Sequence, residues 1–114
     1  MNVQLDFSAL DIPKMEIKLL DANHTTLNLM FPEVKLIERL VAVAPKMREA
    51  QAANDAAAIR QVNELVSDLM SNNLEGVTVK ADELDSKYGL KFVHLIVFTA
   101  KYMEFINSVK DAKN

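Results

Sequence analysis

The sequence predicts an α+β fold that is mostly α-helical, with an N-terminal β-hairpin followed by about four helices, the last one long and strongly apolar. Two segments, residues 14–19 and 26–31, alternate polar and apolar residues with the period of a half-buried strand. Beyond Pro32, apolar residues recur instead at helical spacing. With only two glycines and three prolines, the chain is not typical of a turn-rich all-β fold.

Composition narrows the class of protein further. A length of 114 residues predicts one domain, divided into a hairpin region (1–31) and a helical region (32–114). A formal net charge of −3 argues against nucleic-acid binding, which depends on neutralising phosphates. The absence of cysteine excludes disulfides and thiol nucleophiles. No signal peptide is recognisable, and the longest apolar stretch, 92–98, is too short to cross a membrane. We therefore expect a cytoplasmic protein without membrane or nucleic-acid partners.

The hairpin region contains three alternating segments. Residues 3–7 carry Val3, Leu5 and Phe7 between polar residues, which predicts a strand near the start of the chain. Between the segments 14–19 and 26–31, the loop 21–25 is rich in residues that bond their own backbone or tolerate left-handed conformations. This pattern predicts a β-hairpin with a five-residue loop.

The first helix is expected to begin at Pro32, which fits a first helical turn because it lacks an N–H group. Glu33 in that turn would complement the helix dipole. Pro45 is expected to end or kink the helix. Its apolar face would consist of Val34, Ile37, Leu40, Val41 and Ala44.

The middle of the chain is less clearly patterned. Residues 46–58 fit either a helix or an ordered bend, with Asn54 or Asp55 as an N-cap. A helix should then extend to Ser71 and end with an asparagine in the left-handed region. After a connector, a short helix over 80–88 is expected to end at Gly89. The helix before the connector would bury Ile59, Val62, Leu65, Val66, Leu69 and Met70.

No pattern of catalytic or ligand-binding residues is found. His24 and His94 have no second ligand at metal-binding spacing, so we interpret them as ordinary loop and helix residues. The acidic cluster Asp82, Glu83 and Asp85 lacks the correctly placed glycine of a calcium loop, and a helix dipole explains it.

Neither the serines nor the glycines suggest an active site. Gly76 and Gly89 cannot form a phosphate-binding loop. The protein is not expected to be an enzyme, and we predict no catalytic, cofactor-binding or metal-ligating residue. The serines without a nucleophile motif are Ser8, Ser67, Ser71, Ser86 and Ser108.

The last helix, expected over residues 90–110, has two adjoining apolar stripes that together cover roughly 240° of its surface, whereas facing a core requires only about 100°. Either this helix is the central helix of the core, or one stripe contacts another chain. The first stripe consists of Phe92, Val93, Ile96, Ala100, Met103 and Ile106. The second consists of Leu95, Phe98, Tyr102, Phe105 and Val109.

We predict that the first stripe packs on the core and that the second binds a partner, because three of its five residues are aromatic. Lys91, His94, Lys101 and Glu104 would form its polar rim. The alternative is that the second stripe lies under the hairpin and the first helix. The predicted core consists of Ile17, Leu19, Leu27, Leu29, Ile37, Leu40, Val41, Leu65, Leu69, Ile96 and Met103.

Both ends of the chain, but not its alanine-rich middle, resemble the small tail assembly chaperones of long-tailed (siphovirus-type) bacteriophages. At the C-terminal end the similarity rests on Asp82-Glu83-Leu84, Tyr88-Gly89-Leu90 and Tyr102-Met103-Glu104-Phe105-Ile106. At the N-terminal end it rests on Val3-Gln4-Leu5-Asp6-Phe7-Ser8-Ala9-Leu10, Pro13, Glu16-Ile17-Lys18-Leu19, Leu27-Asn28-Leu29 and Pro32 through Leu40.

This resemblance implies a binding protein that coats the tape measure protein, helps recruit tail tube subunits, forms homo-oligomers and is absent from the finished virion. It also implies a frameshift-extended form, for which the final Lys113-Asn114 could be encoded by a slippery A-rich run. Two alternatives stay open. One is a structural head–tail or tail component of a phage, and the other is a cytoplasmic adaptor or antitoxin-like regulator.

Overall fold

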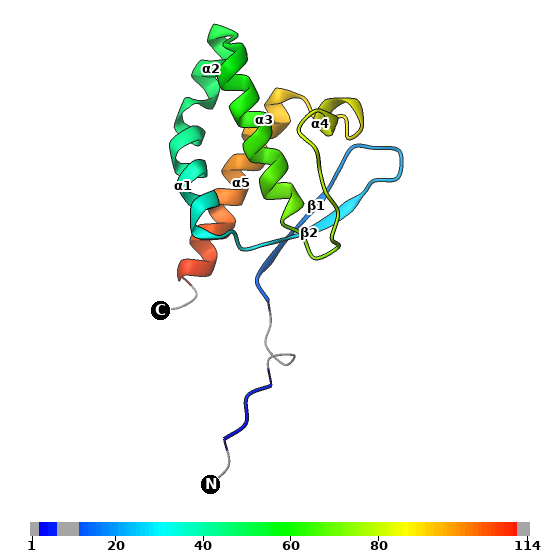
Figure 1. The fold of residues 1–114 in the computed structure, drawn as a ribbon, viewed down its shortest axis with the longest axis vertical. Coiled ribbons are helices and arrows are strands. Elements are labelled where there is room, and N and C mark those ends of the chain that lie inside the picture. Colours follow the sequence, from blue (N-terminus) through cyan, green and yellow to red (C-terminus); the bar gives the residue numbers. More distant parts are fainter. Residues whose placement is uncertain (1–2, 7–11, 112–114) are drawn as a thin grey trace.

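The computed structural model describes residues 3–6 and 12–111, and it confirms the predicted fold class. A two-stranded hairpin is followed by helices, and the last helix is the longest (Figure 1). Predictions that fall on Phe7, Ser8, Lys113 and Asn114 lie outside the described residues. The elements are β1 (Lys14–Lys18), β2 (Thr26–Met30), α1 (Val34–Val43), the 3₁₀ turn η2 (Ala44–Lys46), α2 (Met47–Ala53), α3 (Ala56–Ser71), α4 (Glu83–Ser86) and α5 (Phe92–Asp111).

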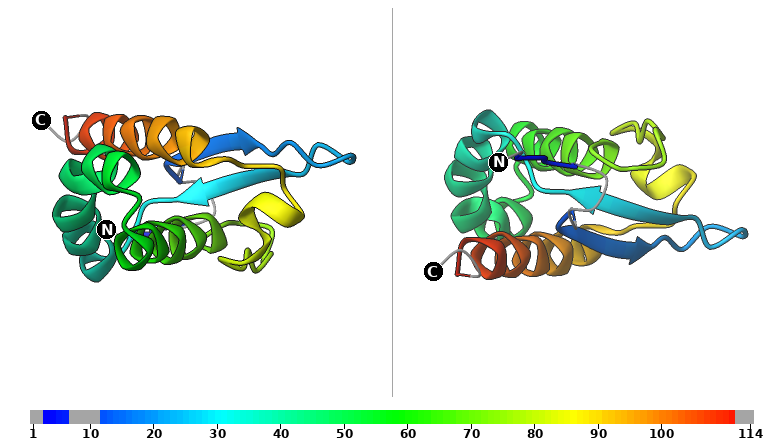
Figure 2. Two further views of the ribbon diagram at one scale, coloured as in Figure 1. Left: turned by 90° about the horizontal axis from the view of Figure 1, so that it is seen from above. Right: turned by 90° about the horizontal axis from the view of Figure 1, so that it is seen from below.

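The hairpin lies between two helices. In both views of Figure 2, β2 runs between α3 on one side and α5 on the other, and α1 and α2 close one end of the molecule. The inner face of the hairpin contributes Leu19, Leu27 and Leu29 to the core. The helices contribute Leu40, Met47, Val62, Leu65, Val66, Leu69, Met70, Leu84, Leu95, Phe98, Tyr102 and Ile106, and the connectors contribute Val79, Tyr88 and Leu90.

The hairpin is antiparallel, and its register pairs Met15 with Leu29 and Ile17 with Leu27. The Leu19 N–H donates to the Thr25 carbonyl at 2.8 Å where the strands leave the loop. In the loop, the Asp21 carboxylate accepts hydrogen bonds from both the hydroxyl and the backbone N–H of Thr25, and these bonds lower the pKa of Asp21. The predicted hairpin and its loop are therefore confirmed.

The strand predicted near the start of the chain is wrong for its described part. Residues 3–6 belong to no strand, and the side chains of Val3 and Leu5 are 91 % and 63 % exposed. A period-two pattern can form a strand only where another strand offers its backbone groups for pairing. In Figure 1 this segment lies well away from β1 and β2, so no such pairing forms within the described chain.

The first helix begins at Val34, two residues later than predicted, because Glu33 has extended backbone angles and acts as the N-cap. Pro32 is buried just outside the helix. The predicted apolar face is also rotated. Val34 and Val41 are exposed, at 68 % and 57 %, while Leu40 is buried. Leu36 and Val43, which the prediction left out, pack against the core with Ile37 and Ala44.

Pro45 does interrupt the helix, as predicted. It lies in the first turn of η2, which separates α1 from α2. Residues 46–58, for which the sequence allowed a helix or a bend, contain the helix α2, a turn at residues 54–55 and the start of α3. Asn54 ends α2 in the left-handed region, with φ at 51°. Asp55 then caps α3, and its carboxylate accepts a hydrogen bond from the Ala58 N–H at 3.2 Å.

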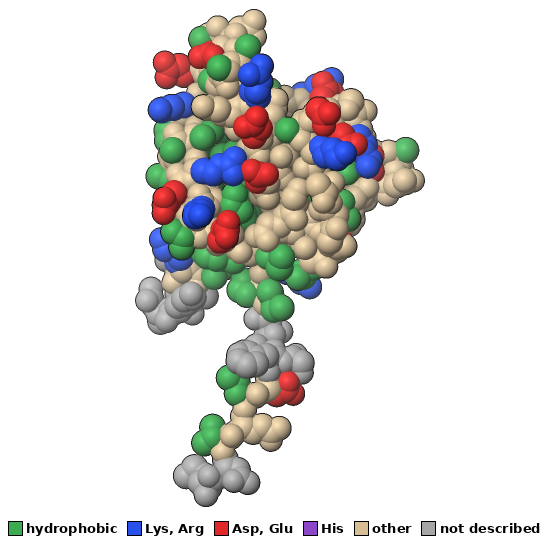
Figure 3. Space-filling model, in the orientation of Figure 1, with side chains coloured by type: hydrophobic (Ala, Val, Ile, Leu, Met, Phe, Trp, Pro, Cys, Tyr) green, Lys and Arg blue, Asp and Glu red, His purple; other side chains and the backbone are tan. Residues whose placement is uncertain are grey.

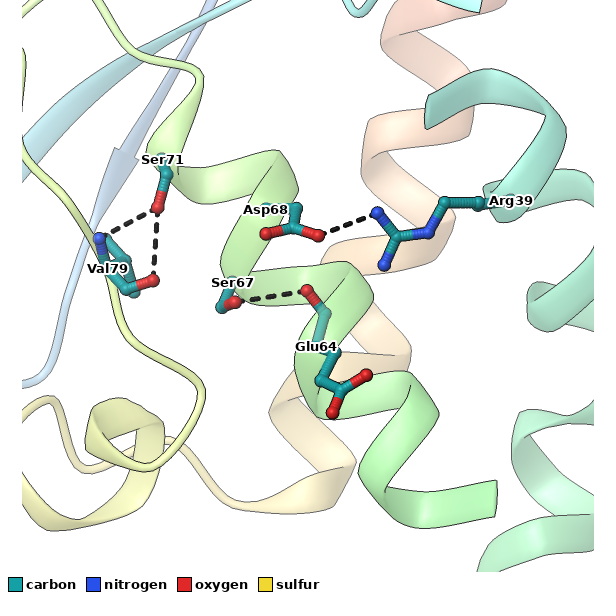
Figure 4. Close-up of polar contacts among 6 residues, drawn as sticks. All are labelled: Arg39, Glu64, Ser67, Asp68, Ser71 and Val79. Carbon is teal, nitrogen blue, oxygen red and sulfur yellow. Dashed lines mark hydrogen bonds and ion pairs between the residues drawn. The ribbon is translucent and has the colours of Figure 1, made fainter. Parts of the chain in front are cut away.

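The end of α3 differs from the prediction, because Asn72 has φ at −86° and does not adopt the left-handed conformation. Asparagine and serine side chains hold the connector that follows. The Ser71 hydroxyl donates to the Val79 carbonyl and accepts from the Val79 N–H (Figure 4). The Asn73 amide nitrogen donates to the Val77 carbonyl, and its oxygen accepts from the Val77 N–H. These bonds fix an irregular segment along the outer edge of β2, where the Leu74 N–H donates to the Asn28 carbonyl.

A hydrogen-bonded turn connects α4 to α5. The helix α4 is shorter than the predicted 80–88, and Gly89, with φ at 70°, turns the chain toward α5. A hydrogen bond from the Leu90 N–H to the Leu84 carbonyl closes this turn.

On the surface, Arg39 of α1 contacts Asp68 of α3 at 2.7 Å (Figure 4). Because both side chains are about half exposed, we expect this ion pair to contribute less than about 1 kcal/mol.

Most of the predicted core is confirmed, with one error. Val41 is wrong, since its side chain faces solvent. Partly buried members that pack against the core are Ile17, Ile37, Ile96 and Met103. Fully buried members are Leu19, Leu27, Leu29, Leu40, Leu65 and Leu69.

Candidate partner-binding surface

The structure places the stripe that was predicted to bind a partner inside the protein. Leu95, Phe98 and Tyr102 are buried, with exposures of 2 %, 8 % and 0 %. Phe105 and Val109 are partly buried, and Phe105 packs against the core. The stripe is therefore no free surface on the folded chain. It packs beside the hairpin, which is one of the two elements named in the alternative above.

Aromatic side chains fix this inward face of α5. The Tyr102 ring lies 5.6 Å from the Phe98 ring and 5.7 Å from the Phe105 ring, measured between centroids. Phe105 in turn meets Phe31, beyond the end of β2, at 6.3 Å in an edge-to-face arrangement. The Tyr102 hydroxyl donates a 2.9 Å hydrogen bond to the Met30 carbonyl. Tyr102 therefore links the longest helix to the hairpin by both packing and a hydrogen bond.

Burial raises the pKa of Tyr102 well above 10.0, its ordinary value. Because only the unfolded chain releases this proton easily, we expect the contribution of Tyr102 to stability to be complete below about pH 10 and to decrease as the pH rises further. Tyr102→Phe should remove the part of the stability loss at alkaline pH that comes from this hydroxyl. At neutral pH it should lower the free energy of unfolding by about 0.5–1.5 kcal/mol through the lost hydrogen bond. Urea unfolding at several pH values measures both effects. An unchanged alkaline dependence in Tyr102→Phe would contradict this role.

The opposite face of α5 is the apolar surface that remains open. Val93 and Val97 are 55 % and 56 % exposed, and Ala100 is exposed one turn further on. Ile96 and Met103 lie beside them and are only partly buried. We call these five residues the outer α5 face. The first predicted stripe contained all of them except Val97, and it was expected to be core.

A groove runs alongside the outer α5 face, between α5 and the turn at Pro45. Its volume is about 300 Å³. It exists because Pro45 interrupts the helix, so that η2 and the start of α2 lie beside α5. Apart from Arg48 and Thr99 its lining is apolar, consisting of Ala44, Pro45, Met47, Ile96, Ala100 and Met103.

Polar residues border this apolar surface. Lys101 and Glu104 form an exposed ion pair at 3.3 Å. At the start of α5, the imidazole Nδ1 of His94 accepts the Lys91 N–H at 2.8 Å, and the Lys91 carbonyl accepts the His94 N–H at 2.9 Å. An apolar centre with a charged margin is the usual composition of a protein–protein interface.

Two residues that were considered above as possible metal ligands, His24 and Asp85, lie on the protein surface. His24 is exposed in the hairpin loop with φ at 48°. Asp85 forms an exposed ion pair with Lys91 at 2.8 Å. Within residues 3–6 and 12–111, no three His, Cys, Asp or Glu side chains are grouped so that they could hold a metal ion. In the same part of the chain, no helix combines the length and apolar character needed to cross a bilayer.

The sequence did not predict that Val97 belongs to the outer α5 face, and it did not predict the groove between α5 and the turn at Pro45. Val97 belongs to neither predicted stripe, although it follows Val93 by one helical turn. The groove depends on how the turn at Pro45 packs beside α5, about fifty residues later in the chain, and no local pattern encodes that contact.

Comparison with known proteins does not assign this chain to a group: no family model, no curated protein and no solved structure matches it.

Proposed function

We propose that the protein is an assembly chaperone of a long-tailed bacteriophage that binds the tape measure protein and acts by binding alone. The observation that carries the proposal is the outer α5 face, an apolar stripe of exposed and partly buried side chains on the longest helix, with an apolar groove beside it. The resemblance of both chain ends to tail assembly chaperones supplies the identity of the client.

The outer α5 face suits an amphipathic helix as its ligand. Val93, Val97 and Ala100 follow one another at helical spacing, which matches the spacing of the anchors that a bound helix presents. Met103 at the edge of the groove can adapt its shape to several apolar side chains. Repeated binding of this kind along an extended helical client would keep its apolar stripe away from water. In this role the protein works in the host cytoplasm, helps recruit tail tube subunits and stays out of the virion.

The test is to replace Val93 and Val97 together by lysine and to measure binding to purified tape measure segments by calorimetry. We expect the Kd to rise at least about tenfold, because two charges would enter the apolar contact. The matched control replaces Val34 and Val41 of α1 by lysine. These two side chains are exposed to a similar extent, and the control should leave the Kd unchanged.

Circular dichroism should show both double variants to be folded. Equal Kd values for wild type and the Val93/Val97 variant would exclude this face as the binding site. Incorporation of the protein into purified virions would favour the structural tail component instead.

A further inference from the structure

We propose that residues 3–6 of one copy add as a β-strand to the outer edge of β1 in a second copy, so that two copies associate by reciprocal strand addition. This inference does not depend on the proposed function, because it concerns the chain alone. It rests on an unpaired strand edge, on an exposed segment of matching pattern, and on the separation of the two within one chain.

The outer edge of β1 is open for pairing. The Leu19 N–H donates a hydrogen bond to the Thr25 carbonyl. Because hydrogen-bonded pairs alternate along an antiparallel ladder, the odd-numbered residues of β1 form the hydrogen-bonded pairs with β2. The N–H and C=O groups of Lys14, Glu16 and Lys18 therefore point away from β2. Among the described residues, nothing bonds to these outward groups.

The two edges of the hairpin differ in this respect. On the far side of β2, the Met30 N–H donates to the Asn72 carbonyl, and the Leu74 N–H donates to the Asn28 carbonyl. The connector after α3 thus covers the outer edge of β2, and β1 presents the remaining free edge. Such an edge is a ready template for another strand.

Residues 3–6 have the pattern that this edge requires. Val3 and Leu5 alternate with polar neighbours, and Phe7 continues the alternation in the sequence. On β1, Met15 and Ile17 face the core but are only partly buried. A strand laid beside β1 with its apolar side chains on that face would cover them. Its polar Gln4 would then lie on the opposite face.

The position of the segment indicates that a second copy takes it up. In Figure 1 and Figure 3, residues 3–6 stand clear of the folded body that contains β1 and β2. Val3 is 91 % exposed, so its own hairpin does not cover it. In a two-fold arrangement each copy both gives and receives a strand, which closes the assembly at two copies. The two short pairings also support one another, because the second forms within the complex.

Two kinds of variant test the proposal by sedimentation equilibrium of the full chain. Val3→Asp with Leu5→Asp should abolish dimers, whereas Gln4→Asp on the opposite face should not. Glu16→Pro removes an outward N–H without removing a bond to β2, so it should also abolish dimers. Glu16→Thr keeps that N–H and serves as its control. Circular dichroism verifies that each variant is folded.

Cysteine cross-linking identifies the chain that supplies the strand, since the natural sequence has no cysteine. Gln4→Cys is mixed under oxidising conditions with a second single variant, in turn Lys14→Cys, Glu16→Cys or Lys18→Cys. We expect a disulfide between chains in at least one mixture. The corresponding double variants should likewise give cross-linked dimers.

Three results would overturn the proposal. The first is a wild-type chain that stays monomeric at the highest concentration it tolerates. The second is a dimer that persists in both the Val3/Leu5 variant and Glu16→Pro. The third is a double cysteine variant that forms its disulfide within one monomeric chain, which would show that the segment pairs with its own hairpin. None of these measurements includes a client, so their outcome is separate from that of the proposed function.

Discussion

Replacing Phe98 and Phe105 together by lysine is expected to unfold the protein. Phe98 is 8 % exposed, and Phe105 packs against Phe31 and Tyr102. Losing a buried phenylalanine costs about 3–5 kcal/mol, and placing an ammonium group in the same space costs several kcal/mol more. Together these losses approach or exceed the total stability of a small domain, which is about 5–15 kcal/mol.

Circular dichroism and size-exclusion chromatography measure this outcome. The matched control is the Val93→Lys, Val97→Lys variant on the opposite face of the same helix, which we expect to keep its helical signal. A Phe98→Lys, Phe105→Lys protein that stays folded and loses only association with a partner would restore the original prediction, in which this stripe was the interface.

The second large effect is expected for Leu65→Ala in α3. The Leu65 side chain is 1 % exposed, and α3 packs against β2, α1 and α5. Removing a buried leucine side chain of this kind costs about 2–5 kcal/mol, because contacts are lost and a cavity remains. Val41→Ala is the control. Its side chain is 57 % exposed, so we expect a change within about 0.5 kcal/mol.

Chemical denaturation of the two variants gives the difference in free energy of unfolding directly. If Val41→Ala were as destabilising as Leu65→Ala, the burial of α1 described above would be wrong. The pair is informative because both residues were predicted to be core from the sequence, and only the structure separates them.

The two stripes of α5 show why the sequence could not distinguish the buried face of this helix from the exposed one. Both stripes satisfy the width that a core-facing helix needs, so periodicity could not tell which one points inward. The preference for aromatic residues at interfaces argued for the second stripe. In the folded chain, those same rings fill the space next to the hairpin. The Tyr102 hydroxyl also finds the Met30 carbonyl there, a partner seventy-two residues away in sequence.

The sequence by itself determined part of the local structure of this protein. Period-two alternation identified β1 and β2, Pro45 identified the break after α1, and Asp55 was one of two candidates for the cap of α3. Each of these features depends on neighbours within a few residues, through backbone hydrogen bonding, a fixed φ angle or a capping side chain.

For α1 and α5, only the tertiary structure decided which face is buried. It turned Val34 and Val41 of α1 toward solvent, buried the aromatic stripe of α5, and left the side chains of Val3 and Leu5 exposed. The physical reason is that burial is a relation between elements. A helix or strand carries the apolar pattern, but the side chains of distant elements determine which part of that pattern is removed from water.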